Sequence, residues 1–327
     1  MKAPAFWQHH DGLAWALVPA LAPAAVLWTC AGRLRRRLTS PYRPRVPLIV
    51  VGNAVAGGAG KTPVALALAA ELARAGRSVG LLSRGHGGRE RGPLRVDPAR
   101  HTAAEVGDEP LLLARAAPTV IARDRVAGAK ALEALGVDII VMDDGLQNPT
   151  IQPSAAVLVV DGGAGFGNGR VMPAGPLREP LPDALGRADA VMMVGDDTAE
   201  AAIALGDAKP IHHARLEPLP GANHLAGRKL LAFAGIGRPA KFFDTLETLG
   251  ANLVDQVGFP DHHPFAELEV MALVERAQAL GATPITTEKD AVRLPAEARA
   301  MVEILPVALV WRDPAPITAW LQRVLAG

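Results

Sequence analysis

A short apolar run, a glycine-rich loop and a helical pattern follow one another between residues 47 and 76. The run PLIVV at 47–51 has the composition of a strand, and VALALAAELARAG has the spacing of a helix that Gly76 ends. In such a loop, backbone N–H groups turn toward phosphates, a lysine reaches the β- and γ-phosphates, and a hydroxyl binds Mg²⁺. The sequence therefore predicts a nucleotide phosphate site, formed by Val55, Ala56, Gly57, Gly58, Ala59, Gly60, Lys61 and Thr62.

The loop departs from the usual phosphate-loop pattern in one place. The pattern G-x-x-x-x-G-K-[ST] begins with glycine, and Val55 stands at that position. The loop instead reads GGAGKT, a variant with paired glycines that is seen in ATPases and kinases. An ordinary glycine-rich turn is the alternative, but the strand before the loop and the helix after it favour nucleotide binding.

A second apolar run, VDIIVM at residues 137–142, ends in two carboxylates. Asp143 and Asp144 stand where a Walker-B aspartate would lie beside the phosphate loop and its Mg²⁺. Taken alone, Asp-Asp-Gly after a strand is more often a turn. The phosphate loop in the same α/β pattern makes the Walker-B interpretation the preferred one. Further strands are expected at residues 79–83, 119–122, 155–160 and 190–194. The helical stretches between them predict an α/β fold with a mostly parallel sheet and helices on both faces.

An uncharged segment at residues 13–31 accounts for much of the apolar composition. Charged residues make up 20% of the chain, where about 25% is typical, and the mean hydropathy is +0.19. As a helix the segment would be about 28 Å long, close to the roughly 30 Å of a bilayer core. Trp15 and Trp28 lie near its ends, and basic residues follow it: Arg33, Arg35, Arg36, Arg37, Arg43 and Arg45.

This pattern predicts a membrane-associated helix with the rest of the chain on the cytoplasmic side, because basic residues accumulate there. Pro19 and Pro23 would kink a spanning helix, so a helix lying in the membrane interface is the main alternative, and a buried soluble helix is the third. A cleaved signal peptide does not fit, because the apolar run is too long and the positive charges follow it.

The charges of the whole chain nearly cancel, with 34 Lys+Arg against 33 Asp+Glu and a formal charge of +1. No overall field attracts nucleic acid, so we expect no nucleic-acid partner. The single cysteine, Cys30, excludes a disulfide framework and fits a reducing compartment.

Side chains suited to phosphoryl transfer occur outside the phosphate loop. Asp108 and Glu109, in VGDEP, open a helical run and could supply a general base or only a favourable helix start. Arg125 could pair with a carboxylate or face a phosphate. Arg178 lies in GNGRVMPAGPLREP, a loop beyond the ends of strands, where ligands bind in open α/β sheets.

A turn near the C-terminus combines Asp261 with His262 and His263. Too few ligands accompany them for zinc, so a histidine that orients a catalytic aspartate is preferred, with a helix cap as the alternative. The string TTEKD at 286–290 lacks the Asn-Lys-x-Asp spacing of a guanine site, which favours ATP over GTP.

With these motifs in order, the sequence closely resembles the tetraacyldisaccharide 4'-kinase family of the lipid A pathway. The resemblance covers nearly the whole chain and is carried by VGNAVAGGAGKTP, LLSRGHGG, VGDEPLLLA, IARDR, VMDDGLQN, GNGRVMPAGPLREP, FAGIGRP, FPDHHPF and TTEKDAVRL. Two positions depart from it: His86 stands where the family usually has tyrosine, and Asn148 where it usually has histidine. These departures put an aromatic contact near the nucleotide in doubt.

The resemblance implies transfer of the ATP γ-phosphate to the 4'-hydroxyl of tetraacyldisaccharide 1-phosphate, which gives lipid IVA. It implies Asp108 as catalytic base with His262 as its partner, and contacts of Thr62, Glu109 and Asp143 with Mg²⁺. It also places Arg125, Asp144 and Arg178 near phosphate or substrate. The partners would be an anionic glycolipid and the cytoplasmic face of the bacterial inner membrane, and a monomer is favoured.

Three parts of the chain are expected. Residues 1–45 form the apolar helix and basic neck, residues 46–225 a P-loop kinase core, and residues 226–327 a smaller C-terminal α/β lobe that closes over the cleft. Residues 211–227 would connect the two lobes. A membrane-tethered P-loop ATPase that drives partner assembly and a nucleotide-dependent binding module are the alternatives from other classes.

Overall fold

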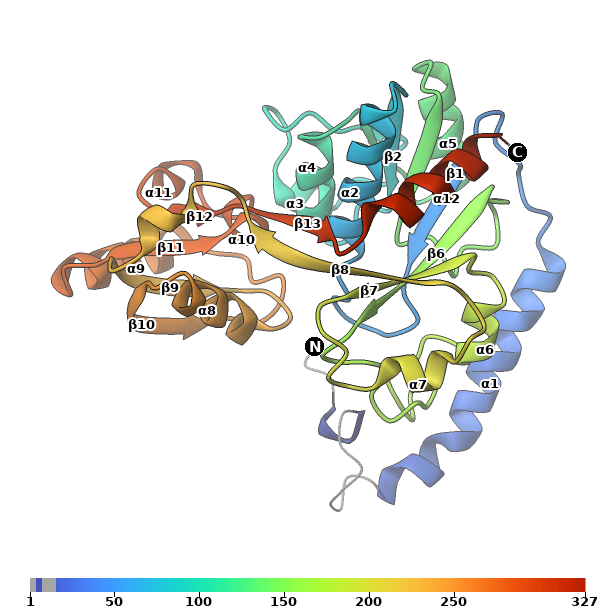
Figure 1. Cartoon of the computed structure of the whole chain (residues 1–327), viewed down its shortest axis with the longest axis horizontal. Coiled ribbons are helices and arrows are strands. Elements are labelled where there is room, and N and C mark those ends of the chain that lie inside the picture. The colour runs from blue at the N-terminus through green and yellow to red at the C-terminus, as the bar shows by residue number, and fades with distance from the viewer. Residues whose placement is uncertain (1–3, 8–15, 327) are drawn as a thin grey trace.

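The structure is a computed structural model that describes residues 4–7 and 16–326, and it is built around two sheets (Figure 1). The larger sheet has nine strands, in the spatial order β13 (Val307–Trp311), β8 (Ile211–Pro218), β7 (Ala190–Val194), β6 (Ala155–Asp161), β1 (Leu48–Gly52), β5 (Ile139–Asp143), β2 (Val79–Ser83), β4 (Thr119–Ile121) and β3 (Leu94–Arg95). The strands from β8 to β4 are parallel, and β13 and β3 pair antiparallel at the two edges. The predicted mostly parallel sheet is confirmed.

Helices cover both faces of this sheet, as predicted. On one face lie α2 (Lys61–Arg74) and α12 (Pro314–Ala326), and on the other α5 (Arg125–Ala134), α6 (Leu181–Leu185) and α7 (Ala201–Leu205). In α2, Val64, Leu68 and Leu72 are four residues apart and fully buried, because this spacing places them on one side of a helix. Two short helices, α3 (Ala103–Val106) and α4 (Asp108–Ala114), lie between β3 and β4 in the chain.

A smaller parallel sheet forms the second lobe, in the order β10 (Asn252–Gly258), β9 (Lys229–Ala234), β11 (Thr283–Thr287) and β12 (Glu303–Leu305). Alternate residues of β9 face opposite sides, so Leu230 packs with α8 (Pro239–Thr248) and Leu231 packs with α9 (Glu267–Ala279) and α11 (Ala296–Arg299). The single turn α10 (Glu288–Ala291) follows β11, and a 3-10 helix, η3 (Ala222–Leu225), precedes β9.

The predicted C-terminal lobe, residues 226–327, extends too far. Residues 229–305 form the smaller sheet and its helices, but β13 returns to the larger sheet and pairs antiparallel with β8. Helix α12 then buries Ile317, Trp320 and Leu321 against that sheet. The predicted connection at 211–227 contains β8, so two adjacent strands join the lobes. The sequence could not show this return, because an apolar strand and an amphipathic helix could have covered either sheet.

The N-terminal helix α1 (Leu17–Leu38) lies along the larger lobe, and the predicted start of its apolar segment, including Trp15, falls outside the described residues. Val18 and Ala25 are buried in a cluster with Phe6, from the 3-10 helix η1 (Ala5–Trp7). Further along α1, Arg33 forms an ion pair with Asp183 and Arg36 forms one with Glu179, both outside the helix. One side of α1 is therefore held by the protein from its first turn to its last.

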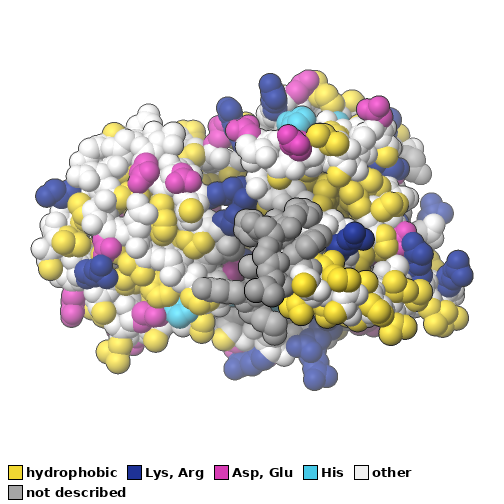
Figure 2. Space-filling model, turned by 90° about the horizontal axis from the view of Figure 1, so that it is seen from below, with side chains coloured by type: hydrophobic (Ala, Val, Ile, Leu, Met, Phe, Trp, Pro, Cys, Tyr) yellow, Lys and Arg dark blue, Asp and Glu magenta, His cyan; other side chains and the backbone are white. Residues whose placement is uncertain are grey.

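The other side of α1 is apolar and exposed. Val26 is 61% exposed, Leu27 71% and Leu38 76%. In Figure 2, which views the molecule from below, apolar side chains gather at the lower right and basic side chains stand around their margin. By length and composition, α1 could also span a membrane.

Candidate functional site

The phosphate loop lies between β1 and α2, as predicted. Asn53 is fully buried, and its Nδ2 donates to the carbonyl oxygens of Val55, at 2.8 Å, and Gly57, at 3.3 Å. Gly57 and Gly60 have φ angles of 125° and 83°, which glycine adopts readily. No side chain of the described residues caps the start of α2, so its first N–H groups are available to an anion.

Lys61 and Thr62 begin α2 and meet the end of β5. Strand β5 pairs with β1, and the Thr62 hydroxyl donates to Asp143 Oδ2 at 2.8 Å. Lys61 Nζ lies 3.6 Å from Asp144 Oδ1. The predicted juxtaposition of the Asp-Asp pair with the loop is therefore present in the fold.

Asp143 is suited to a cation. Its Oδ1 is buried and has no hydrogen-bond partner among the residues that the structure describes. Burial, reinforced by the charge of Glu109, raises the pKa of Asp143 to about 7. No cluster of three or more Cys, His, Asp or Glu with metal-binding geometry occurs in residues 4–7 and 16–326. One carboxylate and one hydroxyl nevertheless fit Mg²⁺, which usually keeps waters and uses substrate phosphates as ligands.

Two arginines face this region in different ways. Arg125 is 4% exposed, its Nη1 donates to the Ala122 carbonyl, and its buried Nε has no hydrogen-bond partner within residues 4–7 and 16–326. Burial and the nearby Arg84 charge lower the pKa of Arg125 to about 10. Arg178 instead donates from Nη1 to Asp144 Oδ1 at 3.0 Å and from Nε to the Val55 carbonyl at 3.1 Å. Arg125 is thus a buried cation that an anion would stabilise, whereas Arg178 supports the loop.

Asp108 and His262 come together from the two lobes. His262 Nδ1 lies 2.9 Å from Asp108 Oδ2, although the residues are 154 positions apart. Asp108 begins α4 directly after Gly107, whose φ is 92°. A Cβ on Gly107 would also collide with the His86 carbonyl oxygen, so this approach requires glycine.

The electrostatics of this pair keep the carboxylate ionised. Burial opposes ionisation of Asp108, but the hydrogen bond from His262 and the charges of Lys289, His262 and Arg293 outweigh it and lower the pKa of Asp108 to about 2. The hydrogen bond to Asp108 also raises the pKa of His262. Since an ionised carboxylate only accepts hydrogen bonds, His262 donates from Nδ1.

Sequence reasoning missed the cations that surround the pair. Lys289 Nζ lies 3.3 Å from His262 Nε2, 3.4 Å from Asp261 Oδ1 and 3.8 Å from Glu109 Oε1. Arg293 Nε lies 3.7 Å from Asp108 Oδ2. Both residues belong to the TTEKDAVRL motif, which contributed to the family resemblance without an assigned role.

The three motifs of the smaller lobe form one scaffold beneath these side chains. Asp290, which is fully buried, accepts from the Gly235 backbone N–H at 3.0 Å. Arg293 donates to the carbonyl oxygens of Gly235, at 2.9 Å, and His263, at 3.2 Å. Residues from FAGIGRP, FPDHHPF and TTEKDAVRL thus fix one another and present His262 and Lys289 to Asp108.

A second ionic contact joins the lobes. Asp161, the last residue of β6, pairs with Arg238 and with Lys241, whose Nζ lies 3.3 Å away. Burial, together with the charge of Arg238, lowers the pKa of Lys241 to about 8. Ionic contacts therefore hold the lobes together at two places, Asp108–His262 and Asp161 with Arg238 and Lys241.

The two departures from the family pattern have local roles. The His86 ring lies 6.0 Å from the His262 ring in an edge-to-face arrangement, so an aromatic residue still contacts the pair. Asn148 Oδ1 accepts from the backbone N–H and the hydroxyl of Thr150, both at 2.7 Å. Asn148 thus shapes a turn after β5.

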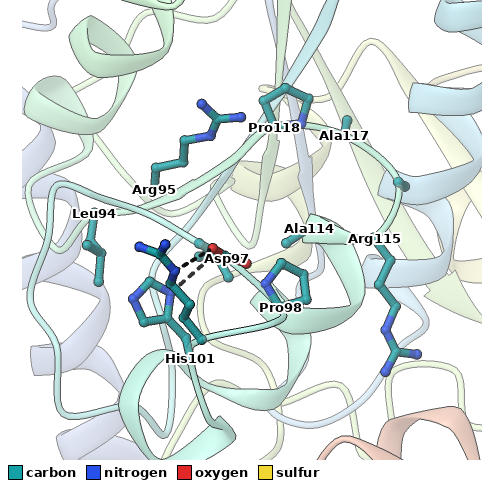
Figure 3. A pocket seen from close by; sticks show the side chains of 12 residues that line it. Leu94, Arg95, Asp97, Pro98, His101, Ala114, Arg115, Ala117 and Pro118 are labelled. Carbon is teal, nitrogen blue, oxygen red and sulfur yellow. Dashed lines mark hydrogen bonds and ion pairs between the residues drawn. The ribbon is translucent and has the colours of Figure 1, made fainter.

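A cavity of about 790 Å³ lies elsewhere, beside the C-terminal end of α4 (Figure 3). Its lining includes Arg95, Asp97, Arg100, His101 and Arg115, and it includes no residue of the phosphate loop or of the Asp108–His262 pair. Asp97 pairs with Arg100 at 3.5 Å, whereas Figure 3 shows Arg115 pointing away from that pair. This cavity is separate from the candidate site.

The chain is similar to known lipid A kinases over its whole described length. The family model described as tetraacyldisaccharide-1-P 4'-kinase matches residues 17–326. A tetraacyldisaccharide 4'-kinase from Rhodospirillum centenum is 57% identical over 100% of this chain and 98% of its own, and one from Gluconacetobacter diazotrophicus is 52% identical over 99% of each. Among solved structures, LpxK from Aquifex aeolicus, in complex with ATP, superposes with a TM-score of 0.77 at 27% identity, covering 94% of this chain and 99% of that one. The chain belongs to the tetraacyldisaccharide-1-P 4'-kinase family.

Proposed function

We propose that this chain transfers the γ-phosphate of ATP to the 4'-hydroxyl of tetraacyldisaccharide 1-phosphate, giving lipid IVA. The observation that carries the proposal is the Asp108–His262 hydrogen bond of 2.9 Å, formed between a phosphate-loop lobe and a second lobe. A base held between two lobes suits a reaction that joins a nucleotide to a separate acceptor. The kinase activity of the family supports the same reaction.

In the proposed mechanism, the N–H groups of residues 57–62 and the Lys61 ammonium hold the β- and γ-phosphates, and Arg125 adds a buried positive charge. The sugar hydroxyl oxygen attacks the γ-phosphorus, the bond between the γ-phosphorus and the β–γ bridging oxygen breaks, and ADP leaves. Asp108 accepts the hydroxyl proton. With a pKa of about 2, Asp108 is a weak base, which suits a loose transition state in which the proton moves late.

His262 orients the carboxylate of Asp108, and Lys289 donates to the other ring nitrogen of His262. This arrangement keeps Nδ1–H directed at Asp108. Thr62 and Asp143 would hold Mg²⁺, and Glu109 would contribute near them. When bound, the ion neutralises charge on the β- and γ-phosphate oxygens.

The decisive test supplies labelled ATP and the disaccharide lipid acceptor to the purified protein in mixed micelles. Labelled lipid that depends on the acceptor supports the kinase. Slow ATP hydrolysis that is indifferent to the acceptor would instead support an assembly ATPase, and binding without turnover would support a binding module. We expect a monomer, which light scattering in the same micelles would check.

The pH dependence of Mg²⁺ binding tests the role of Asp143. Because its pKa is raised to about 7, Asp143 is protonated below that pH and ionised above it. Protons therefore compete with the metal, and apparent Mg²⁺ affinity should be level above pH 7 and fall up to about tenfold per unit below it. The measurement is the KM for Mg²⁺ at saturating ATP between pH 6 and 8.5.

Asp143→Asn is the control, because it leaves the titration of ATP itself in place and removes only the protein carboxyl. The variant should lose affinity at high pH and show a flatter profile. Without metal, burial disfavours the ionised form of Asp143. Wild-type stability relative to Asp143→Asn should therefore fall as pH rises from about 4, the usual pKa of an aspartate, to about 7, and level off above that. Parallel profiles for both proteins would rule out Asp143 as the ligand.

We propose further that α1 lies in the interface of the cytoplasmic leaflet of the inner membrane. A spanning helix would have lipid around it, but one side of α1 contacts the lobe from Val18 to Arg36. The exposed side carries Val26, Leu27 and Leu38, and Arg35 and Arg37 lie in its last turn. An apolar face beside basic residues binds an anionic lipid surface.

Replacing Leu27 by glutamate should reduce binding to anionic vesicles roughly tenfold or more, since a buried leucine contributes about 1.5–3 kcal/mol. Leu268→Glu is the matched control, because Leu268 is 85% exposed on α9 of the other lobe. Flotation with phosphatidylglycerol vesicles measures both. Equal flotation of the two variants would place the membrane contact elsewhere.

A further inference from the structure

Glu179 is a buried carboxylate that the proposed mechanism does not use. It follows Arg178 in the glycine- and proline-rich loop and is 4% exposed. Arg36 of α1 donates to Glu179 Oε2 from Nη2 at 2.5 Å, Gln147 donates to Oε1 from Nε2 at 2.8 Å, and Arg187 forms an ion pair with it. A residue so enclosed and so fully paired links the elements around it.

From Glu179, hydrogen bonds lead into the phosphate loop. Gln147 Nε2 also donates to the Asn53 carbonyl oxygen at 2.9 Å. The Asn53 side chain in turn donates to the Val55 and Gly57 carbonyl oxygens. Arg36 is thereby joined to the loop through Glu179, Gln147 and Asn53, each of which makes a direct contact with the next.

A second connection runs beside the first. Trp28 of α1 donates from Nε1 to the Arg178 carbonyl oxygen at 2.9 Å. The Arg178 backbone N–H donates to the Ala54 carbonyl at 2.7 Å, and the Ala56 N–H donates to the Pro176 carbonyl at 2.8 Å. The segment before Glu179 therefore pairs with the first half of the phosphate loop along its backbone.

We propose that Glu179 is a positioning residue for the phosphate loop, and that docking of α1 through Arg36 and Trp28 holds that loop in the conformation that binds ATP. The membrane-facing helix is then part of the support of the nucleotide site. The proposal rests on the proposed role of residues 55–62 in binding ATP. It implies that losing the contact between α1 and Glu179 weakens ATP binding without any change in a residue that touches the nucleotide.

The chain contains a matched control for this contact. Arg33 of α1 pairs with Asp183 of α6, with Nε 2.8 Å from Oδ2 and Nη2 2.9 Å from Oδ1. Asp183 accepts from the same helix as Glu179 does, but no hydrogen bond of its side chain leads to the phosphate loop among the described residues. Glu179→Gln and Asp183→Asn both replace by an amide a carboxylate that pairs with an arginine of α1, but only Glu179 connects onward to the phosphate loop. Glu179 is also more buried, with 6% of its side chain exposed against 22% for Asp183, so melting temperatures must accompany the comparison.

The experiment measures the dissociation constant of ATP, by titration calorimetry, for the full chain in detergent micelles. Glu179→Gln should weaken ATP binding about tenfold, whereas Asp183→Asn should bind as the wild type does. Arg36→Gln should weaken binding similarly, and combining it with Glu179→Gln should add little, because both act through one contact. In turnover, KM for ATP should rise while KM for the lipid acceptor stays constant.

The outcomes separate this inference from the proposed function. If the wild type binds no ATP, the proposed function fails. If it binds ATP and Glu179→Gln matches Asp183→Asn, the inference is overturned. If the melting temperature shows that Glu179→Gln does not fold, Trp28→Phe decides the question. This variant removes one hydrogen-bond donor from a side chain that is 52% exposed. It should raise the dissociation constant of ATP two- to threefold, which corresponds to a loss of about 0.5 kcal/mol of binding free energy. Unchanged affinity in that variant would overturn the proposal.

Discussion

Asp108→Asn is expected to lower kcat by about 10³-fold, within the roughly 10²- to 10⁴-fold range of a lost general base. Asparagine has the same shape and can still accept the hydrogen bond from His262 Nδ1, but it cannot take the proton of the sugar hydroxyl. ATP binding should be little changed, because in the described part of the chain no hydrogen bond or ion pair links Asp108 to the phosphate loop. Steady-state transfer of labelled phosphate to the lipid measures kcat, and calorimetry measures the ATP affinity.

His262 and Glu105 provide the comparison for this variant. His262→Ala should cost less, about 10- to 100-fold, because His262 acts through Asp108. Glu105→Gln, which alters a carboxylate on the neighbouring helix α3, should leave kcat unchanged. Loss of the Asp108 charge leaves Arg293, which is buried against it, without that carboxylate, so melting temperatures must accompany the rates. Near-normal phosphorylation by Asp108→Asn would disprove the base assignment.

Lys61→Ala should lower kcat/KM for ATP by about 10³-fold. The Lys61 side chain is 9% exposed at the start of α2, where a charge held against a transferring phosphate acts most strongly because water is excluded. A second effect follows from Asp143, since the charge of Lys61 opposes the rise in the pKa of that carboxyl. Removing the lysine should therefore also raise the Mg²⁺ concentration that the enzyme needs.

Two further variants make the Lys61 result specific. Lys61→Arg should rescue little, because a planar guanidinium does not replace a compact ammonium in a closed loop. Lys229→Ala removes an exposed lysine from the start of β9 and should leave the kinetics unchanged. Measuring kcat/KM for ATP at several Mg²⁺ concentrations separates the two effects. A loss below tenfold in Lys61→Ala would show that the ammonium does not contact the phosphates.

Local patterns were enough to predict six strands of the larger sheet (β1, β2, β4, β5, β6 and β7), but not β3, β8 or β13. The runs at 79–83 and 190–194 have the bounds of β2 and β7, because parallel strands buried on both faces are continuous apolar runs. The run at 137–142 corresponds to β5, which ends at Asp143. The return of β13 and α12 was not predictable in this way, since antiparallel pairing with β8 joins segments almost a hundred residues apart.

The residues of the candidate site also divide into those that local sequence patterns predict and those that depend on contacts between distant segments. The phosphate loop and the Asp-Asp pair follow from strand, loop and helix spacing, because each is local. The Asp108–His262 pair came from the family resemblance, since no spacing rule links residues 154 positions apart. Lys289, Arg293 and Glu179 were not predicted, because charges on a short helix or within a loop look like solvated surface until the fold buries them.

The antiparallel pairing of β8 with β13 also shows how the chain passes from the larger lobe to the smaller lobe and back. The smaller lobe is an insertion: the chain leaves the larger lobe at Pro218 and re-enters it at Val307, and these two residues are paired neighbours in the sheet. A short turn could join them without moving either strand. The larger sheet is therefore continuous without the smaller lobe, which supplies His262 and Lys289.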